Sequence, residues 1–214
     1  MAYINIALDK GRLADEALRL FKQIGLEFPE YARDSRKLIF TDKQDEFRMV
    51  LVKGSDVPTY VAKGAADIGV VGKDMLLDAE PDIYELVDLG FGKCRFVVAG
   101  RDASCLNKQK LVVASKYPRV AKSYFLEQGR SVETITLHGS VELAPLVGLA
   151  DCIVDIVETG RTLKENGLKV LREMFPISAR LIANKASMKT KFARLMAFVQ
   201  DVQQIVNGEG VFGS

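Results

Sequence analysis

The sequence has no tryptophan, one histidine and three cysteines among its 214 residues. His138 alone leaves little material for a histidine-rich metal centre or for a histidine-paired nucleophile. The cysteines (Cys94, Cys105 and Cys152) are odd in number and lack the C-x-x-C spacing typical of zinc sites. We therefore expect neither a disulfide framework nor a zinc site, and interpret the cysteines as small buried hydrophobes.

A large charge of one sign and a long apolar run are also missing. Lys and Arg total 30 against 28 Asp and Glu, which gives a net charge of +2. This balance argues against a dedicated nucleic-acid binder, but a small anionic substrate remains possible. No run approaches 18 apolar residues, and Asp9 and Lys10 interrupt the first apolar stretch too early for a signal peptide. We expect a cytoplasmic globular protein with no nucleic-acid or membrane partner.

Short apolar segments alternate with helical patterns along most of the chain, which is typical of an α/β protein. The alternation begins again after about residue 91 and predicts two lobes, with a ligand site in the cleft between them. The predicted strands are residues 3–8, 48–52, 67–71, 83–89, 95–99, 111–114, 132–137, 152–157, 168–174 and 178–183.

Helical spacing predicts helices over residues 13–24, 118–128 and 141–149, the last limited by Pro145. Another helix is expected to begin by capping at Asp56, with Pro58 in its first turn. Apolar residues from Met188 through Phe192 to Ile205 recur at helical spacing, so we predict one long final helix with a core stripe.

Residues 151–163 (DCIVDIVETGRTL) carry the most informative pattern. An apolar strand delivers Asp155 and is followed by a loop containing Thr159, Gly160 and Thr162. Hydroxyls, backbone amides and a helix that starts near Thr162 suit a phosphate, and Asp155 can accept hydrogen bonds from sugar hydroxyls. An ordinary capped turn from strand to helix is the alternative.

This loop resembles the phosphoribosyl-diphosphate (PRPP) loop of phosphoribosyltransferases, although Ile156 stands where the common type has a second acid. The wider pattern is similar to the ATP phosphoribosyltransferase family over nearly the whole chain. Five motifs occur in the family's order: LDKGRL at 8–13, DVPTYV at 56–61, GAADIGVVGKD at 64–74, GSVELAP at 139–145 and DIVETGRTL at 155–163.

The resemblance implies a two-lobed α/β fold similar to periplasmic binding proteins, with the active site in the cleft. Lobe I would comprise residues 1–90 plus 178–214, because the family's chain crosses back, and lobe II residues 91–177. PRPP binding would then fall to a set of residues centred on the loop: Asp155, Glu158, Thr159, Gly160, Arg161, Thr162 and Lys53.

Lys10, Gly11 and Arg12 follow the first predicted strand, where open α/β sheets place ligands. Two cations around a glycine suit a polyphosphate, and a solvated loop is the alternative. Gly72 would allow close approach of a base or ribose, and Asp74 could bond to it, unless this is a plain turn. With the resemblance, the ATP-binding residues are Lys10, Gly11, Arg12, Leu13, Arg33, Gly72 and Asp74.

The resemblance implies that adenine N1 of ATP attacks C1 of PRPP and displaces diphosphate. Because N1 already has a lone pair, the reaction needs no strong base. The candidate catalytic residues are Asp155, Glu142 and Lys10; Glu142 either caps a helix or faces the ribose, and His138 is interpreted as structural. Mg²⁺ is the expected cofactor, held mainly by the substrates' phosphates rather than by a protein metal site.

The length matches the family's short form, which lacks a regulatory domain. This resemblance implies a separate regulatory subunit, similar to histidyl-tRNA synthetase, in a hetero-oligomer. Two other functions remain open: a non-catalytic binding module of the same architecture, and a phosphoribosyltransferase that acts on another base.

Overall fold

The computed structural model describes residues 3–208, which form two compact units. Unit 1 contains the described residues up to Gly92 and those from Ser178 onward, and unit 2 is Lys93–Ile177. The chain therefore leaves unit 1, builds unit 2 and returns to complete unit 1.

Unit 1 is built on a six-stranded sheet in the order β2-β3-β1-β4-β11-β5. Strand β1 pairs in parallel with β3 and β4, whereas β11 is antiparallel to β4 and β5. The elements are β1 (Ile4–Asp9), α1 (Arg12–Gln23), β2 (Ile39–Thr41), β3 (Phe47–Val52), the 3-10 helix η1 (Gly54–Asp56), α2 (Val57–Ala62), β4 (Ile68–Gly72), α3 (Lys73–Ala79), β5 (Tyr84–Asp88), β11 (Ala179–Ala183), α7 (Ser187–Thr190) and α8 (Phe192–Val206).

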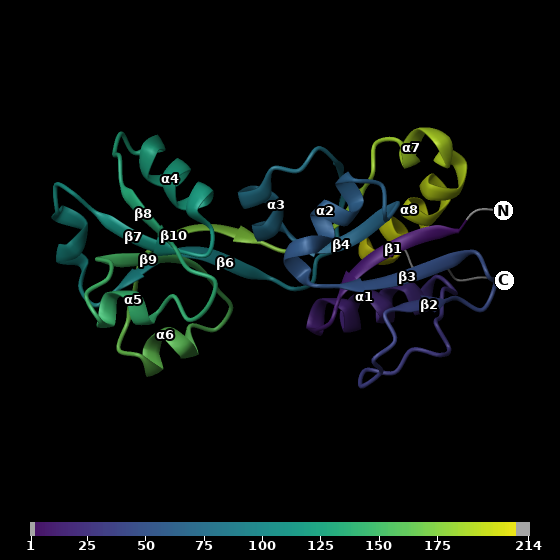
Figure 1. The fold of residues 1–214 in the computed structure, drawn as a ribbon, viewed down its shortest axis with the longest axis horizontal. Helices are drawn as coiled ribbons and strands as arrows, with labels where there is room; N and C mark the ends of the chain where they lie inside the picture. Colours follow the sequence, from purple (N-terminus) through teal and green to yellow (C-terminus); the bar gives the residue numbers. More distant parts are fainter. Residues whose placement is uncertain (1–2, 209–214) are drawn as a thin grey trace. The chain divides into compact units, whose positions relative to one another are not determined.

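Helices cover both faces of this sheet, and alternate residues of its strands point to opposite faces. Ile4, Ile6 and Leu8 of β1 pack in one cluster with α1 and α8. Ala7 packs instead with Val57 of α2, and Figure 1 shows α2 and α3 on the sheet face opposite α1.

Unit 2 has a five-stranded sheet in the order β10-β6-β9-β7-β8. Strands β7, β8 and β9 run parallel, and β6 is antiparallel to β9 and to β10. The elements are β6 (Cys94–Gly100), the 3-10 helix η2 (Ala103–Asn107), β7 (Val112–Ser115), α4 (Pro118–Glu127), β8 (Glu133–Thr136), α5 (Leu143–Leu146), β9 (Cys152–Val157), α6 (Arg161–Glu165) and β10 (Lys169–Ile177).

The helices of unit 2 also divide between two faces, with α4 on one and α5 and α6 on the other (Figure 1). Ile153 and Val157 of β9 pack with Leu163 of α6 in one buried cluster. Asp155 lies between them in the alternating pattern of the strand, so its side chain belongs to the α5–α6 face.

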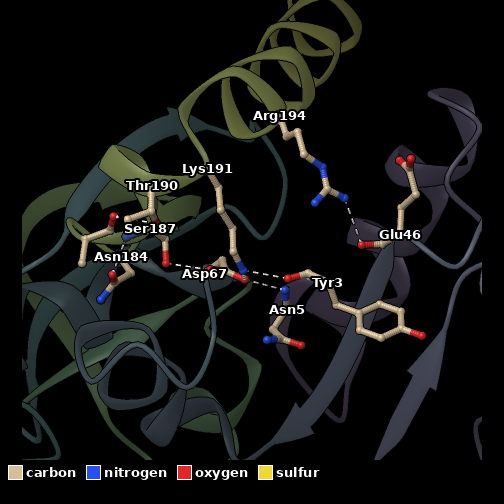
Figure 2. Close-up of polar contacts among 10 residues, drawn as sticks. Tyr3, Asn5, Glu46, Asp67, Asn184, Ser187, Thr190, Lys191 and Arg194 are labelled. Atoms are coloured by element: carbon tan, nitrogen blue, oxygen red, sulfur yellow. Dashed lines mark hydrogen bonds and ion pairs between the residues drawn. The ribbon is translucent and has the colours of Figure 1, made fainter. Parts of the chain in front are cut away.

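A polar cluster ties the returning chain to the start of unit 1 (Figure 2). Asp67 is buried and accepts hydrogen bonds from the Asn5 backbone N–H at 2.8 Å and the Ser187 hydroxyl at 2.6 Å. Lys191 Nζ donates to the Asp67 carboxylate at 2.8 Å and to the Tyr3 carbonyl at 2.7 Å. The ion pair holds the junction of α7 and α8 against β1 and the start of β4.

The predicted long final helix is interrupted at this cluster. The helix is divided into α7 and α8 at Lys191, whose backbone leaves the helical conformation while its ammonium group reaches Asp67. Phe192, expected in the core stripe, is 59% exposed, whereas Leu195 and Val202 are buried as expected.

One other local expectation needs correction, two elements were not predicted, and one alternative reading is not realised. Asp56 makes no capping hydrogen bond, because it ends η1 in a helical conformation and α2 begins directly after it. The short edge strand β2 and helix α3 were not predicted. Gly72 is followed by α3 rather than by a plain turn.

The cysteines match the sequence interpretation only in part, since Cys152 is buried but Cys94 and Cys105 are half-buried. Burial raises the pKa of the Cys152 thiol to about 12, so it stays protonated at neutral pH. Within residues 3–208, none of the helices combines the length and hydropathy needed to cross a bilayer.

Candidate functional site

In unit 2, strand β9 is followed by a turn and a helix, as the sequence predicts, but the helix, α6, is short. Gly160 has φ of 77°, a left-handed conformation that favours glycine. The Thr159 hydroxyl accepts a hydrogen bond from the Arg161 N–H at 3.4 Å, so one of the two expected hydroxyls is engaged locally. Helix α6 has only five residues, so an anion here would meet loop amides more than a helix dipole.

Asp155 lies just before this turn, on the α5–α6 face of the sheet. Its side chain is half-buried, and Oδ1 accepts a hydrogen bond from the Ile156 N–H at 2.9 Å. Glu142 occupies the N-cap position of α5 but makes no side-chain capping bond, so the capping alternative is not realised. Because β8 and β9 run in the same direction as β7, the loops carrying Glu142 and residues 158–160 leave the same edge of the sheet.

The remaining unit 2 candidates are on the surface. Glu158, Arg161 and Thr162 are exposed, and the Glu158 carbonyl accepts a hydrogen bond from Arg95 Nη1 at 3.3 Å. His138 is exposed in the loop after β8, which contradicts the expectation of a structural histidine held in the fold.

In unit 1, the carboxyl ends of β1, β3 and β4 lie at one edge of the sheet, because the three strands are parallel. Asp9 pairs with Val52 in the β1–β3 register. Lys10 and Lys53, the next residue on each strand, therefore leave the sheet side by side. Both are exposed, and Gly11 provides the N-cap position of α1 without a side-chain capping bond. The edge thus offers two ammonium groups and the amides of a helix start.

Sequence reasoning missed Asp9, which lies between these loops. Its Oδ2 is 3.5 Å from the position a Cβ would take on Gly11 and 3.4 Å from that on Gly54. Its Oδ1 is buried and has no hydrogen-bond partner among the described residues. Burial raises the pKa of the Asp9 carboxyl, partly opposed by the Ala14 backbone N–H. The sequence signal was an acid inside the basic LDKGRL segment.

Three of the predicted ATP-binding residues contact other residues of unit 1. Leu13 packs on the core, and its Cδ2 lies 2.4 Å from where a Cβ on Gly92 would stand. Arg12 is 4.0 Å from Glu16, and Arg33 is 3.6 Å from Asp15 with an exposed side chain. Leu13 therefore packs the beginning of α1 against the chain near Gly92, where the first segment of unit 1 ends.

Gly72 and Asp74 are adjacent, but not as the sequence interpretation had them. A Cβ on Gly72 would lie 2.1 Å from Asp74 Oδ1, so the carboxyl of Asp74 occupies the space that the glycine leaves free. Asp74 itself is buried in the first turn of α3. The carboxyl of Asp74 is therefore one reason for a glycine at this position.

The chain is similar to proteins of one enzyme family over nearly its whole length. The family model described as HisG, ATP phosphoribosyltransferase, matches residues 53–205. An ATP phosphoribosyltransferase of Caldanaerobacter subterraneus subsp. tengcongensis is 52% identical over 212 residues, which cover 97% of this chain and 100% of that protein. A solved ATP phosphoribosyl transferase (HisG:HisZ) complex from Thermotoga maritima is 36% identical, with a TM-score of 0.82 and coverage of 96% of this chain and 99% of that chain.

A more distant likeness concerns the fold alone. The periplasmic aliphatic sulphonate binding protein SsuA from Escherichia coli is 12% identical, with a TM-score of 0.60 and coverage of 96% of this chain and 73% of that chain. The architecture is thus the two-lobed α/β fold of periplasmic binding proteins.

Proposed function

The chain belongs to the ATP phosphoribosyltransferase family, and we propose that the sheet edge of unit 1 binds ATP, that the turn after β9 in unit 2 binds PRPP, and that Lys53 of unit 1 also contacts the phosphates of PRPP. The enzyme condenses ATP with PRPP to N1-(5-phosphoribosyl)-ATP and diphosphate, the first step of histidine biosynthesis. The turn from Asp155 to Thr162 carries the PRPP proposal, since it combines a half-buried carboxylate with a glycine in the left-handed conformation.

The reaction forms a bond between adenine N1 and ribose C1 as the bond from C1 to the diphosphate oxygen breaks. The lone pair of N1 makes the new bond, and the electron pair of the broken bond leaves with diphosphate. Positive charge therefore grows on the ribose ring, and negative charge on the leaving group. No proton has to be removed from N1, so the chain needs no strong base at this step.

Asp155 and Glu142 are the groups proposed to act on the ribose. A carboxylate that accepts hydrogen bonds from ribose hydroxyls holds C1 in place and favours the cationic ring. Glu158 follows β9 at the same edge of the sheet, and the amides and hydroxyls of residues 159–162 are the proposed partners of the 5-phosphate. Holding two anionic substrates in line can lower the barrier by as much as about 7–11 kcal/mol.

Lys10, Arg12 and Lys53 are the proposed partners of the polyphosphates. Charge-assisted hydrogen bonds from such groups contribute about 1.5–3 kcal/mol each and neutralise charge on the departing diphosphate. Gly11, Leu13, Arg33, Gly72 and Asp74 complete the proposed ATP side. Among these, the packing of Leu13 and the buried position of Asp74 favour shaping of the site over direct contact.

Mg²⁺ is the proposed cofactor, held mainly by the phosphates of the substrates. When bound, it neutralises part of the negative charge on the leaving diphosphate. The carboxyl of Asp9 fits a cation, because its Oδ1 is buried without a hydrogen-bond partner among the described residues and its Oδ2 lies beside the two basic loops.

A regulatory subunit similar to histidyl-tRNA synthetase is the proposed partner in a hetero-oligomer. Its support is the Thermotoga maritima structure, which is a HisG:HisZ complex. Three free cysteines and the use of ATP agree with a cytoplasmic location.

The test is a mass-spectrometric assay of the purified chain with ATP, PRPP and Mg²⁺, repeated with the regulatory subunit. The expected product is heavier than ATP by one phosphoribosyl group and appears together with diphosphate. A dependence of the rate on the added subunit would support the partner. Binding of both ligands without product in either mixture would favour a non-catalytic binding module instead.

A further inference from the structure

One acid stands at the edge of unit 1 where cations are gathered for polyphosphate. Asp9 ends β1, Lys10 and Arg12 follow it, and Lys53 leaves the paired strand β3 beside it. An ionised carboxylate here repels the phosphates that the three cations attract. A cation between them would be attracted both to the Asp9 carboxylate and to the phosphates.

The position of the carboxyl also leaves it short of partners. Oδ1 is buried and accepts no hydrogen bond from any described residue. A buried acceptor without a donor destabilises the fold, and the cost is larger when the acceptor is charged. Oδ2 lies against the backbones of Gly11 and Gly54, so the carboxyl is lodged between the two candidate phosphate loops.

We propose that Asp9 Oδ1 is a protein ligand of the divalent cation that accompanies the substrate polyphosphate at this edge. The inference rests on the proposed function, because it takes the Lys10 and Lys53 loops to be the polyphosphate site. Mg²⁺ in nucleotide and diphosphate sites is commonly bound by one or two carboxylates together with substrate phosphates and waters. A cation there pairs the orphaned oxygen and converts the repulsion between carboxylate and phosphate into a bridge.

Capping of α1 is the competing role for Asp9. The Ala14 backbone N–H interacts with the carboxyl and lowers its pKa against the larger effect of burial. An amide oxygen can accept the same hydrogen bond, so Asp9→Asn keeps a capping role but loses most affinity for a hard cation. The variant Asp9→Asn therefore distinguishes a capping role from a cation-binding role.

The experiment is isothermal titration calorimetry of ATP alone and of PRPP alone, each with MgCl₂ and each with EDTA. A single substrate does not turn over, so affinity is measured without chemistry. In the unsubstituted chain we expect Mg²⁺ to tighten at least one of the two polyphosphates, and the two titrations identify which. In Asp9→Asn that metal-dependent gain falls by about tenfold or more. Affinity in EDTA is unchanged or tighter, because a repulsive charge is gone.

Asp201→Asn, on the exposed face of α8, is the matched control for the loss of one negative charge and keeps the full gain. The electron paramagnetic resonance spectrum of Mn²⁺ gives a second readout: the protein–ATP or protein–PRPP complex of the unsubstituted chain retains bound Mn²⁺ that Asp9→Asn releases. If Asp9→Asn does not fold, Asp9→Ser takes its place with the same expectations.

An equal Mg²⁺ gain in Asp9→Asn and the unsubstituted chain would overturn the proposal while leaving the proposed function in place. So would an equal loss of affinity with and without metal, which indicates capping, or the absence of any gain in the unsubstituted chain. Failure of that chain to bind either substrate under any condition would instead refute the proposed function, and the inference with it.

Discussion

Asp155 is the residue on which the PRPP proposal depends most. Its carboxylate is half-buried at the end of β9, beside the turn that begins α6. We expect Asp155→Asn to reduce kcat/KM for PRPP by about 10- to 100-fold, because a charge-assisted hydrogen bond to a ribose hydroxyl is weakened. Steady-state kinetics with PRPP varied at saturating ATP measure the effect.

The control for this substitution is Glu165→Gln, which removes one negative charge from the exposed end of the neighbouring helix α6. It should leave PRPP kinetics unchanged. If Asp155→Asn folds normally and keeps its PRPP kinetics, the assignment of Asp155 to the ribose is wrong.

Asp9 should lower the stability of the substrate-free chain at neutral pH. Burial raises the pKa of its carboxyl in the folded state, so the folded chain holds this proton more tightly than the unfolded chain. Its effect on stability therefore becomes unfavourable as pH rises above the unfolded value near 3.8. We expect Asp9→Asn to melt at a higher temperature at pH 7 and to show a smaller difference at pH 3.

Differential scanning calorimetry without substrate or metal measures this difference, with Asp201→Asn as the control. A lower melting temperature for Asp9→Asn at pH 7 would mean that the hydrogen bond from Ala14 outweighs the burial of the charge.

At the scale of elements, the ion pair between Asp67 and Lys191 decides how the last two helices join unit 1 (Figure 2). Lys191→Met leaves a buried carboxylate without its cation. Removing one partner of a buried pair costs about 3–5 kcal/mol, and the 23% exposure of the Lys191 side chain favours the lower end. Urea unfolding of Lys191→Met and of Lys189→Met, on the exposed side of α7, separates the ion pair from the loss of a lysine. Equal stabilities would show that packing alone holds the junction.

Helix α2 crosses strand β4 at Gly69 with little space between them. A Cβ there would lie 2.9 Å from Val57 Cγ1, 3.0 Å from Val61 Cγ2 and 3.2 Å from the Ala7 carbonyl. Gly69→Ala must push α2 away from the sheet, and we expect it to destabilise the chain by about 1–3 kcal/mol.

Gly139→Ala is the control for this prediction, because a Cβ on Gly139 would meet no atom within 4 Å. Chemical unfolding of the two variants measures the difference. A stability of Gly69→Ala equal to that of the unsubstituted chain would mean that α2 moves at no cost.

For the molecule as a whole, acid should destabilise the fold through its paired carboxyls. Burial alone would raise the pKa of Asp88 and of Asp151, but hydrogen bonds outweigh it, from Ser178 and Gly90 to Asp88 and from Lys108 to Asp151. Both pKa values are therefore lowered. The stability they contribute is present above the unfolded value near 3.8 and is lost as pH falls through the folded value.

We expect the melting temperature to change little between pH 7 and about pH 5 and to fall steeply below about pH 4. Asp151→Asn should melt lower at pH 7 and show a shallower fall in acid. Identical slopes for the two proteins would exclude the pair of Lys108 and Asp151 as a source of acid sensitivity.

The sequence by itself determined the fold class and the family. Local patterns are sufficient for both, because alternation of apolar residues depends on near neighbours and motif order is a property of the chain. The predicted strands at 152–157 and 178–183 lie close to β9 and β11, and the expected lobe limits, 90/91 and 177/178, lie near the unit limits at Gly92 and Ile177. The family resemblance also supplied the return of the chain to the first lobe.

Only the tertiary structure decided features that depend on residues far apart in the chain. The last helix is divided at Lys191, whose ammonium group pairs with Asp67, 124 positions away. Gly72 is required by the carboxyl of Asp74, and Leu13 is drawn into packing near Gly92. Asp9 looked like one acid in a basic loop, and only the fold buries its Oδ1 and places its Oδ2 beside Gly54, which follows the neighbouring strand β3. Burial, orphaned hydrogen-bonding groups and long-range charge pairs arise only when the strands are brought together, so no local pattern contains them.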